Sequence, residues 1–172
     1  MTTYDAAPHL RDLTEFQRRS VDHVFDQFYG PAQAQRFLVA DETGLGKTRV
    51  AQGVIAKAIE HLQHDDSVKR IDVIYVCANA DLAQQNIKRL NVTGQPELPF
   101  SSRLTMLGAH SARLNTRAKG GHKPINLVSF TPGTSFDMGH SLGMARERAM
   151  ILLGLSEIYD FDGWTWKAAL RI

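Results

Sequence analysis

Residues 41–48 read Asp-Glu-Thr-Gly-Leu-Gly-Lys-Thr, and this stretch decides the fold. The short apolar run at residues 37–40 before it predicts a strand, and residues 46–63 after it have helical spacing. Glycines allow a tight turn whose N–H groups point inward, and the start of the following helix adds positive potential. A strand, a glycine loop and a helix in this order predict a phosphate-binding loop.

The loop supplies a separate group for each part of a nucleotide with its magnesium ion. The Lys47 ammonium would reach the β- and γ-phosphates, and the Thr48 hydroxyl would hold Mg²⁺. We therefore predict ATP and Mg²⁺ as cofactors, Lys47 and Thr48 as catalytic residues, and Thr48 as the contact to the metal. The predicted cofactor-binding residues of the loop are Glu42, Thr43, Gly44, Leu45, Gly46, Lys47 and Thr48.

Helical and strand patterns alternate along the rest of the chain. The expected helices cover residues 13–29, 46–63, 79–90 and 141–158, and the expected strands cover residues 37–40, 71–77, 103–107 and 125–130. Asn79 or Asp81 would cap the third of these helices. Such alternation predicts an α/β fold in which helices flank a parallel sheet on both faces.

Two segments resemble motifs of one helicase group. The loop departs from the strict pattern, which has Gly or Ala where this chain has Asp41, and Asp-Glu-x-Gly-x-Gly-Lys-Thr resembles its form in helicase superfamily two, the Snf-like and DEAD/DEAH-type ATPases. Residues 13–19, Leu-Thr-Glu-Phe-Gln-Arg-Arg, resemble the glutamine motif of these helicases. The resemblance implies that Gln17 binds adenine, whose edge presents a donor beside an acceptor, as an amide does.

Two further segments resemble motifs that contact nucleic acid. Residues 77–86 are similar to motif Ia, which implies contacts from Asn79 and Gln84 to the strand backbone. Residues 129–134 are similar to motif Ib, which implies contacts from Thr131 and Gly133. Two simpler interpretations stay open: residues 79–81 cap a helix, and Pro-Gly at 132–133 forms a turn.

The resemblance covers residues 13–135 and rests on the order of the four motifs. It implies a RecA-like P-loop fold that is incomplete in this chain. We expect an N-terminal helix with the glutamine motif at residues 1–35, a partial RecA-like ATP-binding domain at 36–140, and a helix and tail at 141–172.

An acidic motif that such enzymes need for Mg²⁺ and water is not found. The acids after Ser129 form no Asp-Glu pair behind an apolar strand; they are Asp137, Glu147, Glu157, Asp160 and Asp162. We therefore expect nucleotide binding with little or no turnover. The length of 172 residues is also too short for two motor domains, which suggests a truncated product, a gene fragment or one piece of a split enzyme.

Three functions are compatible with these patterns. The first is the ATP-binding part of a nucleic-acid-dependent ATPase, a helicase or translocase acting on DNA rather than RNA. The second is a non-catalytic module that binds ATP and nucleic acid and works with a partner chain, which would supply the rest of the motor. The third is a small-molecule kinase, against which Gln17 and the 131–133 motif stand.

Charge and composition add weaker constraints. A net charge of +2 does not by itself indicate nucleic-acid binding. The acid-free stretch at residues 103–123 is either a solvated loop or a phosphate contact; its basic residues are Arg103, Arg113, Arg117, Lys119 and Lys123. No apolar run approaches the ~20 residues of a membrane span, and the first residues lack a secretory signal, so we expect a cytoplasmic protein without membrane contact.

Overall fold

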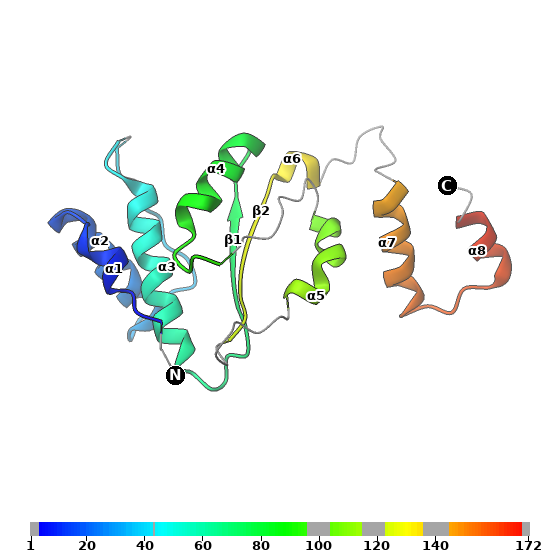
Figure 1. Ribbon diagram of the computed structural model, residues 1–172, viewed down its shortest axis with the longest axis horizontal. Helices are drawn as coiled ribbons and strands as arrows, with labels where there is room; N and C mark the ends of the chain where they lie inside the picture. Colours follow the sequence, from blue (N-terminus) through cyan, green and yellow to red (C-terminus); the bar gives the residue numbers. More distant parts are fainter. Residues whose placement is uncertain (1–3, 43, 96–103, 115–122, 136–144, 170–172) are drawn as a thin grey trace.

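The computed structural model describes residues 4–42, 44–95, 104–114, 123–135 and 145–169 (Figure 1). Its helices are α1 Ala7–Arg11, α2 Glu15–Tyr29, α3 Lys47–Gln63, α4 Ala80–Leu90, η1 Leu104–His110 (a 3-10 helix), α5 Ser111–Leu114, α6 Pro132–Ser135, α7 Ala145–Ser156 and α8 Gly163–Ala169. Its strands are β1 Ile71–Val76 and β2 Ile125–Phe130. Among the described helices, none combines the length and apolar character that crossing a membrane requires.

A parallel pair of strands forms the centre of the molecule. β1 pairs with β2 in the register Ile71↔Ile125 through Val76↔Phe130. Parallel strands need a long crossover connection, and α4 lies within it. Figure 1 shows α3 and α4 on one side of this sheet and α5 on the other. The predicted α/β class with a parallel sheet flanked by helices is therefore confirmed.

The N-terminal helices pack on α3. Thr14 caps α2 in a capping box with Gln17, which fixes where this helix begins. Leu13 and Val21 are buried against Val50 of α3. A second core cluster lies further along α3 and reaches the sheet; its buried members are Ala6, Ala56, Ile59, Ile71 and Val92. Burial of apolar faces on both sides of α3 makes this helix the centre of the core.

Two of the predicted strands are wrong. Residues 37–40 form no strand, and Leu38 is 83% exposed. The Phe37 ring instead lies edge-on to the rings of His23 and Phe28 on α2, at centroid distances of 5.4 and 6.5 Å. The predicted strand at 103–107 is replaced by the 3-10 helix η1, which begins at Leu104. Strand identity depends on a pairing neighbour, and neither segment pairs with another in the described part of the chain.

One residue of the basic stretch has a structural partner. Lys123 Nζ donates to the carbonyl oxygen of Leu62 at 2.8 Å and to that of Asp65, at the C-terminal end of α3. A cation there satisfies free carbonyls and interacts favourably with the helix dipole. Arg103, Arg117 and Lys119 lie outside the described residues, as does the side chain of Arg113. For those residues both interpretations, solvated loop and phosphate contact, stay predictions.

We expect Lys123→Met to lower the free energy of unfolding by about 1 kcal/mol, because half-buried carbonyls lose a charged donor. Urea unfolding measures this change as a lower midpoint at an unchanged slope. The matched control is Lys69→Met, since Lys69 is exposed and close by in the chain. Equal losses in both variants would contradict a capping role for Lys123.

Candidate nucleotide site

The glycine loop enters α3 through backbone that favours glycine. Gly44 has φ +94°, and Gly46, the N-cap of α3, has φ +83° in the left-handed region. No side chain caps α3, and within its first turn the N–H groups of Arg49 and Val50 donate to the Gly46 carbonyl oxygen at 2.7 and 3.1 Å. The N–H groups of Lys47 and Thr48 come before the first intrahelical hydrogen bonds and are left for a ligand. A helix start of this kind favours an anion. Glu42 and Leu45 are exposed beside it, and Thr43 lies outside the described residues.

The side chain of Lys47 occupies the loop. Its Nζ donates to the carbonyl oxygens of Asp41 at 2.7 Å and Glu42 at 3.0 Å. The loop backbone therefore folds around the ammonium group. Phosphate oxygens carry more negative charge than these carbonyls and form stronger hydrogen bonds with a cation, so a bound phosphate would compete well for the Lys47 ammonium.

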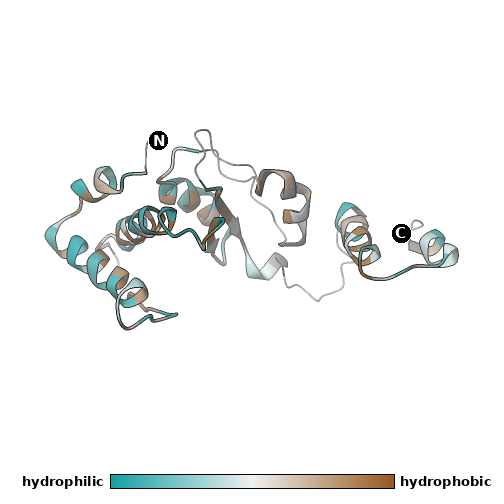
Figure 2. Cartoon of the chain, turned by 90° about the horizontal axis from the view of Figure 1, so that it is seen from below, coloured by the Kyte–Doolittle hydropathy of each residue, from teal (hydrophilic) through white to brown (hydrophobic). Residues whose placement is uncertain are grey.

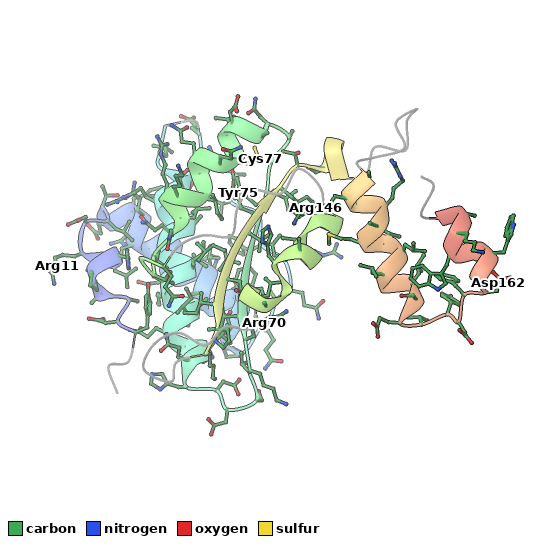
Figure 3. The ribbon with its side chains drawn as sticks, turned by 45° about the vertical axis from the view of Figure 1, so that its right-hand side comes forward. Arg11, Arg70, Tyr75, Cys77, Arg146 and Asp162 are labelled. Atoms are coloured by element: carbon green, nitrogen blue, oxygen red, sulfur yellow. The ribbon has the colours of Figure 1, made fainter. Side chains whose placement is uncertain are left out.

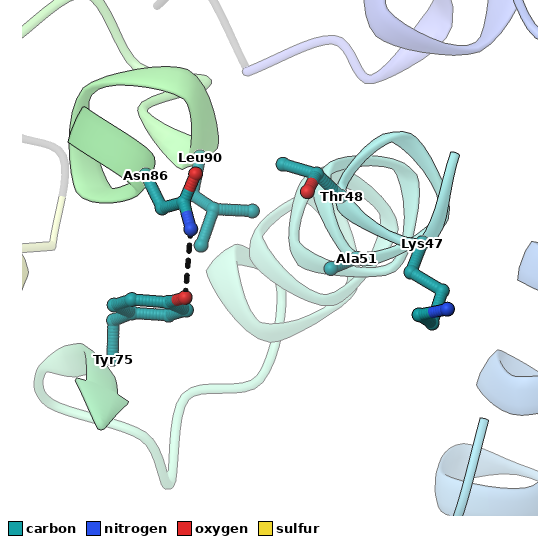
Figure 4. A pocket seen from close by; sticks show the side chains of 6 residues that line it. All are labelled: Lys47, Thr48, Ala51, Tyr75, Asn86 and Leu90. Atoms are coloured by element: carbon teal, nitrogen blue, oxygen red, sulfur yellow. Dashed lines mark hydrogen bonds between the residues drawn. The ribbon is translucent and has the colours of Figure 1, made fainter. Parts of the chain in front are cut away.

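Thr48 faces away from the loop side occupied by Lys47. With Ala51 it borders a hollow of about 310 Å³. Figure 4 shows Thr48 and Ala51 facing Tyr75, Asn86 and Leu90 across this space, while the Lys47 side chain points away from Tyr75 and Asn86. The hydroxyl predicted to hold Mg²⁺ thus lies at the junction of the loop and the hollow.

Gln17 lies against the glycine loop. Its Nε2 donates to the Leu45 carbonyl oxygen at 3.2 Å, and its Oε1 accepts from the Thr14 N–H at 3.2 Å. A Cβ placed on Gly46 would lie 2.5 Å from Gln17 Nε2, so glycine is needed there for close approach as well as for backbone conformation. Both ends of the amide are in use, and adenine would have to replace these partners.

The predicted nucleic-acid contacts follow the ends of the two strands. The Cys77 N–H donates to the Phe130 carbonyl oxygen at 3.3 Å, so motifs Ia and Ib begin side by side. Figure 1 places these strand ends at the same edge of the molecule as the loop before α3. In parallel sheets ligands bind beyond the carboxyl ends of the strands. The structure therefore brings all four motifs to one edge.

The four residues predicted to contact nucleic acid differ in how accessible they are. Asn79 caps α4, its side-chain oxygen accepting from the Leu82 N–H at 3.0 Å, as the simpler interpretation expected. Gln84 and Gly133 are exposed. Thr131 is only 3% exposed, which leaves little of its hydroxyl for a phosphate. Contact of these four residues with nucleic acid stays a prediction.

Two polar residues at this edge were missed by sequence reasoning. Asn86 Nδ2 on α4 lies 2.9 Å from the Tyr75 hydroxyl on β1. Figure 3 shows Tyr75 near the end of β1 that lies beside α4, whereas Arg70 lies near the other end of this strand. Strand periodicity indicates which face Tyr75 occupies, and helical periodicity does the same for Asn86, but neither pattern pairs them.

The two-stranded parallel sheet flanked by helices defines a domain of the α/β class. The DEAD/DEAH box helicase family model matches residues 14–156, and the chain belongs to this family. The match confirms the resemblance to helicases and the RecA-like fold, and it reaches from the glutamine motif into α7. The family is one of ATP-binding helicase modules that act on nucleic acid. Searches of curated proteins and of solved structures found no match.

Proposed function

We propose that this chain is the ATP-binding part of a nucleic-acid-dependent ATPase, a helicase or translocase. The observation that carries this proposal is the seat of Lys47, whose ammonium is held by two loop carbonyls at the uncapped start of α3. A cation and free N–H groups at one point form a phosphate site.

In this proposal each loop residue has a defined role toward ATP and Mg²⁺. Lys47 binds the β- and γ-phosphates and Thr48 holds the metal, as in other P-loop proteins. The phosphates are surrounded by the loop backbone, which is that of Glu42, Thr43, Gly44, Leu45 and Gly46. Gln17 binds adenine after its hydrogen bond to the Leu45 carbonyl oxygen is replaced by one to the base. That 3.2 Å hydrogen bond already places Gln17 beside the site. Mg²⁺ supplies charge neutralisation when bound.

Nucleic acid, DNA rather than RNA, would bind across the shared strand edge. The oxygen of Asn79 is engaged by its own helix, whereas its NH₂ group has no partner among the described residues and offers donors to a phosphate. Gln84 and the backbone of Gly133 are exposed at the same edge. Thr131, being buried directly before α6, would act by holding the start of this short helix in place.

We further propose that the 172-residue polypeptide turns ATP over slowly. No Asp-Glu pair follows an apolar strand after Ser129, and phosphoryl transfer relies on such groups for metal and water. A second candidate, a non-catalytic module that acts with a partner chain, is favoured by one observation. Ile74 and Val76 of β1 are 57% and 51% exposed, and β1 has one strand neighbour in the described part. A partner strand could pair with the other edge of β1, and a partner chain could cover the exposed side chains on the face of this strand.

The division into three parts stays a proposal, as does a cytoplasmic location. α2 packs on α3, which attaches this helix to the loop domain. α7 carries hydrophobic residues (Figure 2), and three of them, Ile151, Leu153 and Leu155, are exposed. Such residues fit a segment that needs a further surface to pack against.

Binding of a fluorescent ATP analogue with Mg²⁺, measured with single-stranded DNA or RNA of the same sequence, tests the proposal. We expect saturable ATP binding, tighter binding to DNA than to RNA, and phosphate release near background. A folded chain that binds no ATP would overturn the proposed function. Phosphate release at a helicase-like rate would overturn the slow turnover alone, and tighter binding to RNA would overturn the choice of DNA.

A further inference from the structure

The Asn86–Tyr75 hydrogen bond connects two elements with different proposed roles. Asn86 is half-buried on α4, whose N-terminal end carries the predicted nucleic-acid contacts. Tyr75 belongs to β1 and turns its ring toward α4, with 2.9 Å between its hydroxyl and Asn86 Nδ2. The donor is assigned to Asn86, and the phenol oxygen accepts. Side chains on two separate elements are thereby held in one arrangement.

Both residues also face the nucleotide end of α3. Tyr75, Asn86 and Leu90 line the hollow of about 310 Å³ on one side, and Lys47, Thr48 and Ala51 line it on the other (Figure 4). The first turn of α3 is therefore separated from α4 by space at this level. A shift of α4 would change the width of the hollow beside Thr48.

A second hydrogen bond holds the C-terminal end of α4. Gln52 Nε2 on α3 donates to the Arg89 carbonyl oxygen at 3.0 Å, and Ala83, Ile87 and Leu90 are buried. The C-terminal end of α4 is thus attached to α3, and its middle is attached to β1. A force on the exposed N-terminal end would act mainly on the Asn86–Tyr75 contact, which lies between that end and the Gln52 hydrogen bond.

We propose that Tyr75 and Asn86 are positioning residues that couple nucleic-acid binding at α4 to ATP binding at α3. The inference rests on the proposed function. In it, neither residue touches ATP or the strand. Their hydrogen bond sets the position of α4 relative to Thr48, so the arrangement favoured by one ligand favours the other. Because coupling is reciprocal, ATP must tighten DNA binding by the same factor as DNA tightens ATP binding.

The test measures the dissociation constant of a non-hydrolysable ATP analogue with and without single-stranded DNA, in wild type, Tyr75→Phe and Asn86→Leu. We expect wild type to show coupling on the order of tenfold. Each variant is expected to lose about threefold or more of it while binding each ligand alone as wild type does. The reverse measurement, DNA binding with and without the analogue, must give the same factors.

Two variants control for general effects. Tyr4→Phe also removes a tyrosine hydrogen bond, from its hydroxyl to the Val92 carbonyl oxygen at 3.2 Å, but it lies away from the hollow. Gln85→Ala changes an exposed neighbour of Asn86. Both should keep wild-type coupling. Full coupling in Tyr75→Phe and Asn86→Leu would overturn this inference and leave the proposed function standing. An equal loss of coupling in Tyr4→Phe would show that the effect is not specific to Tyr75 and Asn86. A wild type that binds neither ligand would overturn both the inference and the proposed function.

Discussion

Lys47→Ala is expected to weaken binding of an ATP analogue by about 100-fold, which corresponds to about 3 kcal/mol. In the wild type the lysine would form charge-assisted hydrogen bonds to two phosphates, each worth about 1.5–3 kcal/mol. Part of this binding energy is offset, because the lysine must give up its present carbonyl partners when the phosphates bind. Those partners are the carbonyls of Asp41 and Glu42, at 2.7 and 3.0 Å. Fluorescence titration with Mg²⁺ present measures the change.

The matched control for this prediction is Lys57→Ala on the same helix. Lys57 pairs with Asp22 at 2.7 Å and lies over the Phe25 ring, so its removal takes a positive charge from α3 without touching the loop. It should bind the analogue as wild type does. Thermal unfolding of both variants checks that they fold. A folded Lys47→Ala that binds the analogue as tightly as wild type would show that the loop does not hold phosphates.

Local chemistry made the glycine loop and the four longest described helices predictable. Glycine at positions 44 and 46 predicted a tight turn, and both residues have the positive φ that such a turn favours. The expected helix at 13–29 is α2, and the expected strand at 125–130 is β2 with the same bounds. The helix expected at 141–158 is α7, which begins at Ala145 after residues outside the described part. In each of these, the signal lies within the segment itself.

Features that depend on a distant partner were not predictable. The run at 37–40 has strand composition, but its aromatic residue packs on α2 and no strand pairs with it in the described part. The Tyr75–Asn86 contact needs the relative position of β1 and α4, which periodicity does not contain. Gln17 is a different case, because Thr14-x-x-Gln17 is itself a capping-box pattern. That pattern predicts the structural role that the amide has here, beside the adenine role implied by the resemblance.

Gly53→Val is expected to lower the free energy of unfolding by about 3 kcal/mol, and Gly53→Ala by about 1 kcal/mol, because overpacking outweighs helix propensity. Replacing an interior helical glycine by alanine gains about 1 kcal/mol, whereas forcing extra methyl groups into a packed core costs about 1–3 kcal/mol. A Cβ on Gly53 would lie 2.7 Å from Val21 Cγ2 and 3.2 Å from Leu13 Cδ1. Val21 is 0% exposed and has no room to move away, so the overpacking cost decides the sign.

Gly154→Ala is the matched control, since Gly154 is also inside a helix but has no atom within 4 Å of a Cβ placed on it. Only the propensity acts there, and we expect the variant to be more stable by up to about 1 kcal/mol. Urea unfolding of the three variants measures the loss of stability expected at Gly53 and the gain expected at Gly154 in the same protein. Stabilisation by Gly53→Ala comparable to that by Gly154→Ala would mean that α2 is not packed on α3 as described. Opposite signs at the two glycines would instead support the close α2–α3 packing that holds Gln17 against the loop, 3.2 Å from Leu45.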